Sequence, residues 1–216
     1  MSDSVVLYDY WRSSASYRVR IALNLLRRTY VARQINLLDG THGAPDYLSI
    51  NPQGLVPALE IDGQTLTQSL AIIEYLHATD GASTLLPRTV EGQFRVRQLS
   101  YAVAMEIHPV CNLSVASYAA GRTAAATEEK QAWMERFISL GLDRLEALLA
   151  QGGTGRFCYG DQATMADCCL IPQLYNADRW AVDYARHRHI SRIADAARAD
   201  KAFADAHPDM VGPPPA

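Results

Sequence analysis

Residues 11–23 read Trp-Arg-Ser-Ser-Ala-Ser-Tyr-Arg-Val-Arg-Ile-Ala-Leu and place a cluster of hydroxyl groups beside the cation of Arg12. Apolar residues before this stretch alternate as in a β-strand, and those after it recur at the spacing of an α-helix. The serines therefore lie at a helix N-terminus, where backbone N–H groups favour an anion and lower the pKa of a nearby thiol. Ser13 and Ser14 are equally typical of a helix N-cap, and the stretch taken alone favours that role.

The composition points to a small-molecule substrate. The chain has 216 residues, enough for one large domain or two small ones, and a formal net charge of −3. No run of Lys or Arg indicates a nucleic-acid or membrane surface, and no stretch reaches the ~18 apolar residues of a membrane span. The first residues, Met-Ser-Asp-Ser, lack the basic region of a secretion signal, so we expect a cytoplasmic protein.

The four cysteines form no recognisable metal or disulfide pattern. They show neither Cys-x-x-Cys spacing nor histidines at metal-ligand intervals. Two of them are adjacent and would point to different faces of a helix. We therefore expect reduced thiols and no metal site. The cysteines are Cys111, Cys158, Cys168 and Cys169.

The first eighty residues alternate between strand and helix patterns. Asp62-Gly63 lies between two short apolar runs and predicts a hairpin, so that pair of strands is antiparallel and the sheet is mixed. The result is an α/β domain of βαβββα order over residues 1–82. Strands are expected at 4–10, 30–36, 57–61 and 64–66, helices at 14–28 and 69–78, and a helical turn near 40–50.

Helical patterns dominate the rest of the chain. One long helix is marked by Val96, Leu99, Val103 and Ile107 and is expected to continue through residues 108–112. Thr164 with Asp167 forms a capping box that predicts another helix start. A further long helix is marked by Trp133, Phe137, Leu140, Leu145 and Leu148. The expected boundaries are 88–210 for an all-α domain and 211–216 for a disordered tail.

Two further places in the first domain have the chemistry of a binding site. If the Val56-Pro57 peptide bond is cis, the backbone of Val56 can pair with a bound peptide, although a proline that protects a strand edge is about as plausible. Gln68-Ser69 opens a helix whose N-terminus would suit a carboxylate, and here too a simple N-cap is the alternative.

Together and in this order, these elements resemble the glutathione transferase superfamily. Residues 13–23 are similar to the zeta-class signature Ser-Ser-Cys-Ser-Trp-Arg-Val-Arg-Ile-Ala-Leu, and the similarity covers nearly the whole chain. It continues through residues 51–57, 68–76 and 160–167. The resemblance implies the glutathione transferase fold, with a thioredoxin-like N-terminal domain that binds glutathione, an all-α C-terminal domain and a homodimer.

The resemblance also assigns the hydroxyl cluster. Ser13 would hydrogen-bond the glutathione sulfur, while Ser14 and Ala15, at the start of the following helix, would stabilise the thiolate. Ala15 departs from the signature, because eukaryotic members have cysteine there. Chemistry that needs a protein thiol is therefore lost, but isomerisation is not, since the reacting sulfur belongs to glutathione.

The remaining glutathione contacts follow from the same match. Val56 would bind the cysteinyl backbone, and Gln68 and Ser69 the γ-glutamyl group. His42 matches a histidine that contacts glutathione in bacterial relatives, although on its own it is a loop histidine.

Residues of the helical domain would complete the site. His108 and Asn112 are four apart and should share one face of the long helix unless Pro109 kinks it. The matching residues approach glutathione or substrate in bacterial relatives. Arg179 matches an arginine that binds a substrate carboxylate, and with Arg12 it would hold anionic charge; alone it is an ordinary helix C-terminal cation. After Asp183, Tyr-Ala-Arg-His-Arg-His replaces the family's Thr-Pro-Tyr-Pro, so the loop shape there is open.

The implied activity is glutathione-dependent cis–trans isomerisation of a small anionic enoic acid of the maleylacetoacetate type, in the breakdown of tyrosine or other aromatic acids. Three alternatives remain. They are a maleylpyruvate isomerase of gentisate breakdown, a conjugating transferase or α-halo acid dehalogenase, and a ligand-binding protein without catalysis.

Overall fold

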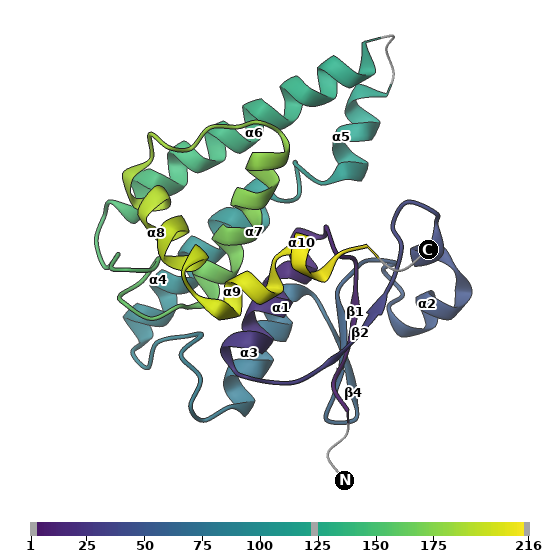
Figure 1. The fold of residues 1–216 in the computed structure, drawn as a ribbon, viewed down its shortest axis with the longest axis horizontal. Helices are drawn as coiled ribbons and strands as arrows, with labels where there is room; N and C mark the ends of the chain where they lie inside the picture. Colours follow the sequence, from purple (N-terminus) through teal and green to yellow (C-terminus); the bar gives the residue numbers. More distant parts are fainter. Residues whose placement is uncertain (1–3, 122–124, 214–216) are drawn as a thin grey trace. The chain divides into compact units, whose positions relative to one another are not determined.

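The computed structural model describes residues 4–121 and 125–213, which form two compact units (Figure 1). Of these residues, 4–86 and 200–213 form the first unit, and 87–121 and 125–199 form the second.

The first unit contains a four-stranded sheet in the order β2-β1-β3-β4, and the sheet is mixed, as the hairpin signal predicts. β1 pairs with β2 in parallel and with β3 antiparallel, and β3 pairs antiparallel with β4. The strands are β1 (Val6–Asp9), β2 (Val31–Gln34), β3 (Ala58–Ile61) and β4 (Gln64–Thr67). The helices within residues 4–86 are α1 (Ser14–Leu25), the 3-10 helix η1 (Thr41–Gly43), α2 (Pro45–Ile50) and α3 (Ser69–Thr79).

Both faces of this sheet are covered by helices. α1 and α3 lie on one side of the strands and the short helix α2 on the other (Figure 1). Val6 and Tyr8 point toward the α2 side, where they pack with Tyr47 and Val56 in one apolar cluster. Leu7 lies between them in β1 and points to the opposite face, because side chains alternate along a strand. All four residues of β1 are buried as a result.

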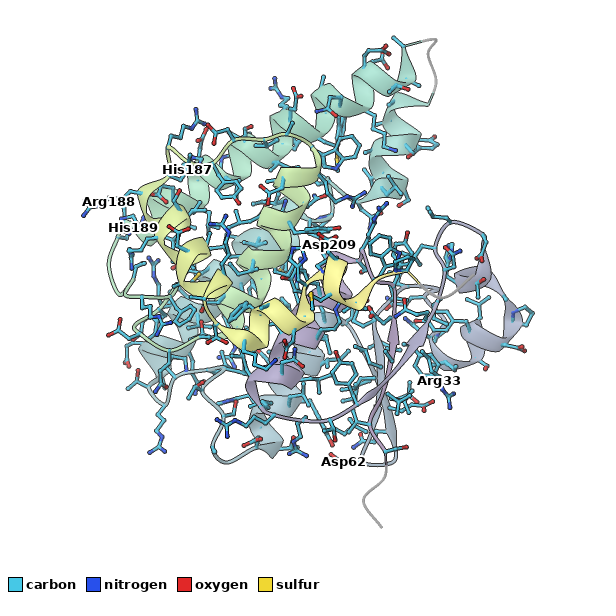
Figure 2. All side chains as sticks on the ribbon, in the orientation of Figure 1. Arg33, Asp62, His187, Arg188, His189 and Asp209 are labelled. Carbon is cyan, nitrogen blue, oxygen red and sulfur yellow. The ribbon has the colours of Figure 1, made fainter. Side chains whose placement is uncertain are left out.

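The β3–β4 hairpin turns at Asp62-Gly63, as predicted. Both residues have positive φ angles, 52° and 71°, which is the conformation that two-residue hairpin turns require. Asp62 lies at the outer end of the hairpin (Figure 2), where its carboxylate accepts a hydrogen bond of 2.9 Å from the Tyr75 hydroxyl of α3. The turn is thus tied to the helix that follows it.

The end of the chain belongs to the first unit, where it packs against α1. Asn24 donates a hydrogen bond to the Ala202 carbonyl, and His207 meets the Tyr17 ring edge-on at 6.0 Å. This differs from the expected boundary of 88–210, because sequence periodicity does not say which surface a short helix covers. The two helices involved are α9 (Lys201–Ala206) and α10 (Pro208–Val211). Val211 therefore ends a helix rather than beginning a tail, and residues 214–216 lie outside the described part.

A buried ion pair joins α1 to the neighbouring segments of the first unit. Arg20 and Asp9 are both fully buried and 2.7 Å apart. The Arg20 guanidinium also donates to the carbonyls of Trp11 and Ala206, each at 3.0 Å. One side chain therefore connects the end of β1, the approach to α1 and the C-terminal segment.

The second unit is helical, as expected. Its elements are α4 (Val90–Tyr101), the π-helix η2 (Ala102–Ile107), α5 (Leu113–Ala120), α6 (Ala126–Leu149), α7 (Met165–Arg179) and α8 (Arg188–Arg198). The buried face of α6 is formed by Met134, Ile138, Leu142, Leu145 and Leu149. Of the residues that predicted this helix, only Leu145 belongs to the buried face. Leu140 is exposed, whereas the Trp133 ring packs on Phe137 and its indole N–H donates to the Val110 carbonyl.

The capping box at the start of α7 is confirmed. The fully buried Asp167 carboxylate accepts hydrogen bonds from the backbone N–H of Thr164, the hydroxyl of Thr164 and the backbone N–H of Cys158. Burial raises the pKa of Asp167, and the hydrogen bonds from Cys158 and Thr164 oppose that shift. One carboxylate thus satisfies three buried donors.

Replacing Asp167 with alanine should lower the free energy of unfolding by about 2 kcal/mol, because these donors lose their acceptor. Urea unfolding measures the change. Asp161→Ala is the matched control, since Asp161 accepts a single hydrogen bond from the Arg156 backbone N–H at an exposed position. Equal losses in the two variants would contradict the role of the capping box.

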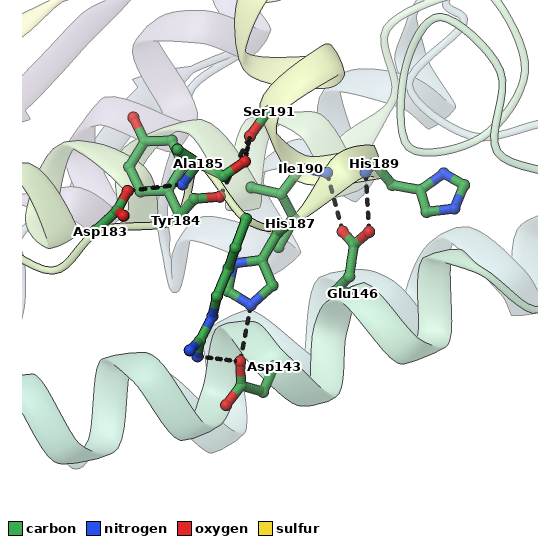
Figure 3. A network of polar contacts seen from close by, with 10 residues as sticks. Asp143, Glu146, Asp183, Tyr184, Ala185, His187, His189, Ile190 and Ser191 are labelled. Carbon is green, nitrogen blue, oxygen red and sulfur yellow. Dashed lines mark hydrogen bonds and ion pairs between the residues drawn. The ribbon is translucent and has the colours of Figure 1, made fainter.

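A carboxylate pair on α6 holds the start of α8 (Figure 3). Asp143 accepts hydrogen bonds from the Nε2 of His187 at 2.8 Å and from the Arg186 guanidinium at 2.6 Å. Glu146 accepts from the backbone N–H groups of His189 and Ile190 and so caps α8 from outside its own helix. The hydrogen bond from His187 and the contacts with Arg186 hold the pKa of Asp143 below its usual range.

This network predicts a pH dependence of stability. Because the pKa of Asp143 is lowered by folding, its contribution is complete above the unfolded value of about 3.9 and is lost as the pH falls through the folded value. The side chain is half exposed, so the contribution is small. The difference in unfolding free energy between the protein and Asp143→Asn should therefore shrink between pH 5 and pH 3. A constant difference over that range would contradict the prediction.

Candidate functional site

The predicted hydroxyl cluster stands at the N-terminus of α1. Ser13 is its N-cap, and the Ser13 Oγ accepts a hydrogen bond of 3.2 Å from the backbone N–H of Ser16. The structural role of a cap is therefore confirmed. It does not exclude the functional one, because capping uses an acceptor lone pair of the hydroxyl and leaves its proton to donate. No described residue accepts that proton.

The neighbours of Ser13 remain accessible at the same helix end. Ser14 and Ala15 form the first turn of α1 and are half-buried. Arg12 is exposed, and its guanidinium lies 4.1 Å from the centre of the Trp11 ring. The first turn thus combines a hydroxyl donor, the positive end of the helix dipole and a nearby cation, which is a suitable environment for a thiolate.

The loop before β3 presents the backbone of Val56. The Val56-Pro57 peptide bond is cis, and Val56 lies just outside the strand. Within residues 4–121 and 125–213, no hydrogen bond to the backbone N–H or carbonyl of Val56 is formed. Both groups are therefore available to the backbone of a bound peptide.

Two residues that the sequence did not single out shape this loop. The carbonyl of Leu55 accepts hydrogen bonds of 2.7 Å from both the Asn51 side-chain amide and the Tyr47 hydroxyl. Burial raises the pKa of Tyr47 to about 12, so its hydroxyl stays protonated. Asn51 and Tyr47 thus hold the backbone immediately before Val56. The local sequence does not predict these two hydrogen bonds, because an Asn-Pro pair at the start of a loop is typical of an ordinary turn.

The start of α3 is the third part of the site. Gln68 has φ 69° and ψ 107°, an uncommon conformation for a residue with a side chain, and such strain is often found at functional sites. Its side chain makes no cap and instead donates to the Gln53 side chain at 2.9 Å. Ser69 is the first residue of α3, and its Oγ accepts a hydrogen bond from the buried Arg18 at 3.2 Å.

His42 lies beside the same loop. A Cβ atom added to Gly54 would be 3.1 Å from the His42 carbonyl oxygen, so a glycine is needed for this close approach, and Gly54 also has φ +62°. His42 Nδ1 is buried and makes no hydrogen bond among the described residues. The loop around Gly54 thus contacts His42 through its backbone and Gln68 through the Gln53 side chain.

The three remaining candidates lie in the second unit, and one prediction about them is wrong. His108 and Asn112 do not share a helix face: α4 continues into η2 and ends at Ile107, and Asn112 is the N-cap of α5. The reason is Pro109, which has no N–H to continue the helix. The Asn112 side chain accepts from both the backbone N–H and the hydroxyl of Ser114.

Arg179 is the last residue of α7, as predicted. It is exposed, and its guanidinium lies 6.0 Å from the centre of the Tyr175 ring one turn earlier. Among the described residues it forms no ion pair, so its charge is available to an anion.

The cysteines are not part of this chemistry. All four are buried and none forms a disulfide bond with another described residue, and burial raises the pKa of Cys111 to about 12. In the part of the chain that the structure describes, no cluster of His, Cys, Asp or Glu is arranged to hold a metal ion. No helix formed by the described residues has the length and apolar character to span a bilayer.

The residues of the first unit fit a tripeptide thiol such as glutathione. Ser13 offers a donor at a helix N-terminus for a thiolate, and the unpaired backbone of Val56 suits the cysteinyl residue. Gln68 and Ser69, at a second helix start, suit the amino acid group at the other end. These groups correspond to the thiol, the cysteinyl backbone and the γ-glutamyl end of that molecule.

Comparison with known proteins finds matching family models and relatives. Family models described as glutathione S-transferase N-terminal domain and C-terminal domain match residues 3–78 and 127–210. The chain is 52% identical to a maleylacetoacetate isomerase of Rhizobium meliloti (strain 1021), over 99% of this chain and 100% of that one. It is 41% identical to a maleylpyruvate isomerase of Ralstonia sp, over 88% and 90% of the two chains.

A solved structure shares the whole fold. It is the maleylacetoacetate isomerase of Methylobacterium extorquens AM1 with bound malonate and glutathione, which superposes with a TM-score of 0.91 at 38% identity and covers 98% of this chain and 100% of its own.

Proposed function

The chain belongs to the glutathione S-transferase family, and from that premise we propose that it is a glutathione-dependent cis–trans isomerase of maleylacetoacetate. The observation that carries the proposal is the donor hydroxyl of Ser13 at the N-terminus of α1, together with 52% identity to a maleylacetoacetate isomerase over the full chain. When bound, glutathione supplies the thiol that adds to the cis double bond and leaves it after rotation.

The first unit binds and activates glutathione. Ser13 donates its hydroxyl proton to the sulfur, and Ser14 and Ala15 at the start of α1 add the field of the helix dipole, so the thiol pKa falls below its ordinary value of about 8.5. The backbone of Val56 pairs with the cysteinyl residue, and Gln68 and Ser69 bind the γ-glutamyl group. His42 makes a further contact from the neighbouring loop.

Cations hold the anionic substrate. Arg179 binds a substrate carboxylate, and Arg12 stabilises negative charge that develops during the reaction. His108 and Asn112 assist from the turn after η2 and the start of α5. The malonate bound to the Methylobacterium extorquens AM1 enzyme is itself a small dicarboxylate, which supports an anionic substrate.

The decisive experiment supplies maleylacetoacetate and maleylpyruvate in turn, with and without glutathione, and follows the loss of the cis-enol absorbance. Glutathione-dependent turnover of maleylacetoacetate with the higher kcat/KM is expected. A higher kcat/KM for maleylpyruvate would favour the activity that the Ralstonia relative is named for. If glutathione promoted conversion of neither compound, the isomerase proposal would fail and a transferase or dehalogenase would be tested next.

Replacing Arg179 with methionine should raise the KM for the substrate about tenfold and leave the dissociation constant of glutathione unchanged, because one charged hydrogen bond to the substrate is lost. Initial rates and calorimetry measure the two constants. Arg188→Met, which removes an exposed arginine from the start of α8 (Figure 2), is the matched control. An unchanged KM in Arg179→Met would contradict the assignment.

The protein should act as a homodimer. An apolar stripe of exposed side chains runs along α4 and η2 at helical spacing. It is formed by Val90, Phe94, Tyr101 and Met105, which are 38–77% exposed. An exposed apolar stripe of this kind is typical of a protein interface. Light scattering should give twice the mass of one chain, and Phe94→Glu should halve it. A monomer before substitution would refute this.

We place the reaction in the cytoplasm, in the breakdown of tyrosine and related aromatic acids. Four buried cysteines that form no disulfide bond among the described residues suit a reducing compartment. Cell fractionation tests the location, and growth of a deletion strain on tyrosine tests the pathway.

A further inference from the structure

Arg18 occupies an unusual position for an arginine. It lies in α1, one turn beyond the hydroxyl cluster, and is only 3% exposed. Its Nη1 donates to the Oγ of Ser69, the first residue of α3, at 3.2 Å. The contact spans 51 residues of sequence and joins the two helices whose N-termini carry the proposed glutathione contacts.

The chemistry of this pair fixes the direction of the Ser69 hydroxyl. A guanidinium has donors only, whereas a hydroxyl has one donor and two acceptor lone pairs. Ser69 must therefore accept from Arg18, and its own proton is left to point elsewhere. Because hydrogen bonds in a chain polarise one another, accepting from a cation also makes the hydroxyl a stronger donor.

Simple packing does not account for a buried guanidinium here. Taking a cation out of water costs several kcal/mol, and apolar side chains would join α1 to α3 at lower cost. The charge lies in contact with the residue that opens α3, where burial weakens screening by solvent. A carboxylate that meets the Ser69 hydroxyl would therefore feel the Arg18 cation behind it.

From this geometry, and resting on the proposed function, we propose that Arg18 is a positioning residue that sets the Ser69 hydroxyl as a donor to the α-carboxylate of the γ-glutamyl group. It acts through Ser69 and makes the N-terminus of α3 selective for a ligand with that carboxylate. Without Arg18, Ser69 would bind this carboxylate less tightly, since the hydroxyl proton could rotate toward other acceptors.

The test is a double-mutant cycle on glutathione binding, measured by calorimetry so that it does not depend on turnover. Arg18→Met should weaken glutathione binding about tenfold, or about 1.4 kcal/mol. In the Ser69→Ala background the same change should cost less than about twofold, because the acceptor is absent. The analogue 4-aminobutanoyl-cysteinyl-glycine lacks the α-carboxylate, and its affinity should not change with Arg18→Met.

Controls separate positioning from loss of structure. Asn24→Ala removes the hydrogen bond from α1 to the Ala202 carbonyl and should lower stability without changing glutathione affinity. Arg18→Lys keeps the cation and should lie between the protein and Arg18→Met in affinity, so it carries the cycle if the methionine variant does not fold. At saturating glutathione, the kcat of the Arg18 variants should stay within about twofold of that of the unaltered protein, because the loss is one of glutathione affinity.

Several outcomes would overturn the inference. These are equal losses with and without Ser69, equal losses for glutathione and the analogue, or no glutathione binding by the unaltered protein. Failure of the proposed function would give a different result. Glutathione would bind and the double-mutant cycle would show the Ser69-dependent loss of affinity, but neither maleylacetoacetate nor maleylpyruvate would be isomerised.

Discussion

Replacing Ser13 with alanine should lower kcat about ten- to hundredfold and change the dissociation constant of glutathione much less. The Ser13 hydroxyl is the side-chain donor at the N-cap of α1, and a hydrogen bond to a charged acceptor contributes about 1.5–3 kcal/mol. Without it the bound thiol ionises less readily. The absorbance of the thiolate in the binary complex, followed against pH, should show a raised thiol pKa.

The substitution also removes the N-cap, so a control must separate catalysis from stability. Losing the hydrogen bond from the Ser16 backbone N–H costs about 1 kcal/mol. Ser13→Thr keeps both the cap and the hydroxyl and should retain most of the turnover. Unchanged kcat in Ser13→Ala, with a normal melting temperature, would refute the role of this hydroxyl.

Replacing Arg20 with methionine should lower the free energy of unfolding by about 3–5 kcal/mol. Asp9 would remain fully buried with its charge uncompensated, and the carbonyls of Trp11 and Ala206 would each lose a donor. Because Arg20 ties the C-terminal segment to α1, that segment should also become accessible to protease before the rest of the first unit.

A second variant distinguishes an unpaired charge from poor packing. In Arg20→Met with Asp9→Leu, both charged groups are gone, and most of the lost stability should return. Chemical unfolding of the two variants and of the original protein gives the comparison. A loss below about 1 kcal/mol in Arg20→Met alone would contradict the assigned role of the pair.

Much of the fold was predictable because its signals are local. The change from strand to helix period around the serines, the Asp62-Gly63 hairpin turn and the capping box from Thr164 each depend on neighbours within a few residues. The expected βαβββα order and the mixed sheet follow from such signals. The expected continuation of the long helix through His108 and Asn112 is wrong, because Pro109 lacks the N–H that would extend the helix beyond η2, which ends at Ile107.

The candidate site was predictable only in part, for the same physical reason. The local sequence pattern indicated the Ser13 hydroxyl at a helix N-terminus and the Val56 backbone beside a proline as candidate binding groups. The family resemblance then implied which part of glutathione each would bind. The contacts of Gln68 with Gln53 and of Ser69 with Arg18 could not be foreseen, since each joins side chains far apart in sequence.

The sequence by itself therefore determined the order of strands and helices in the first unit, the starts of α1, α3 and α7, and the residue types at those starts. Only the tertiary structure decided that the buried Arg18 reaches the start of α3 and that Arg20 holds the returning C-terminal segment. Local propensities act over a few residues along the chain. A buried side chain finds its partner only when the packing of distant segments brings a donor and an acceptor within hydrogen-bond distance.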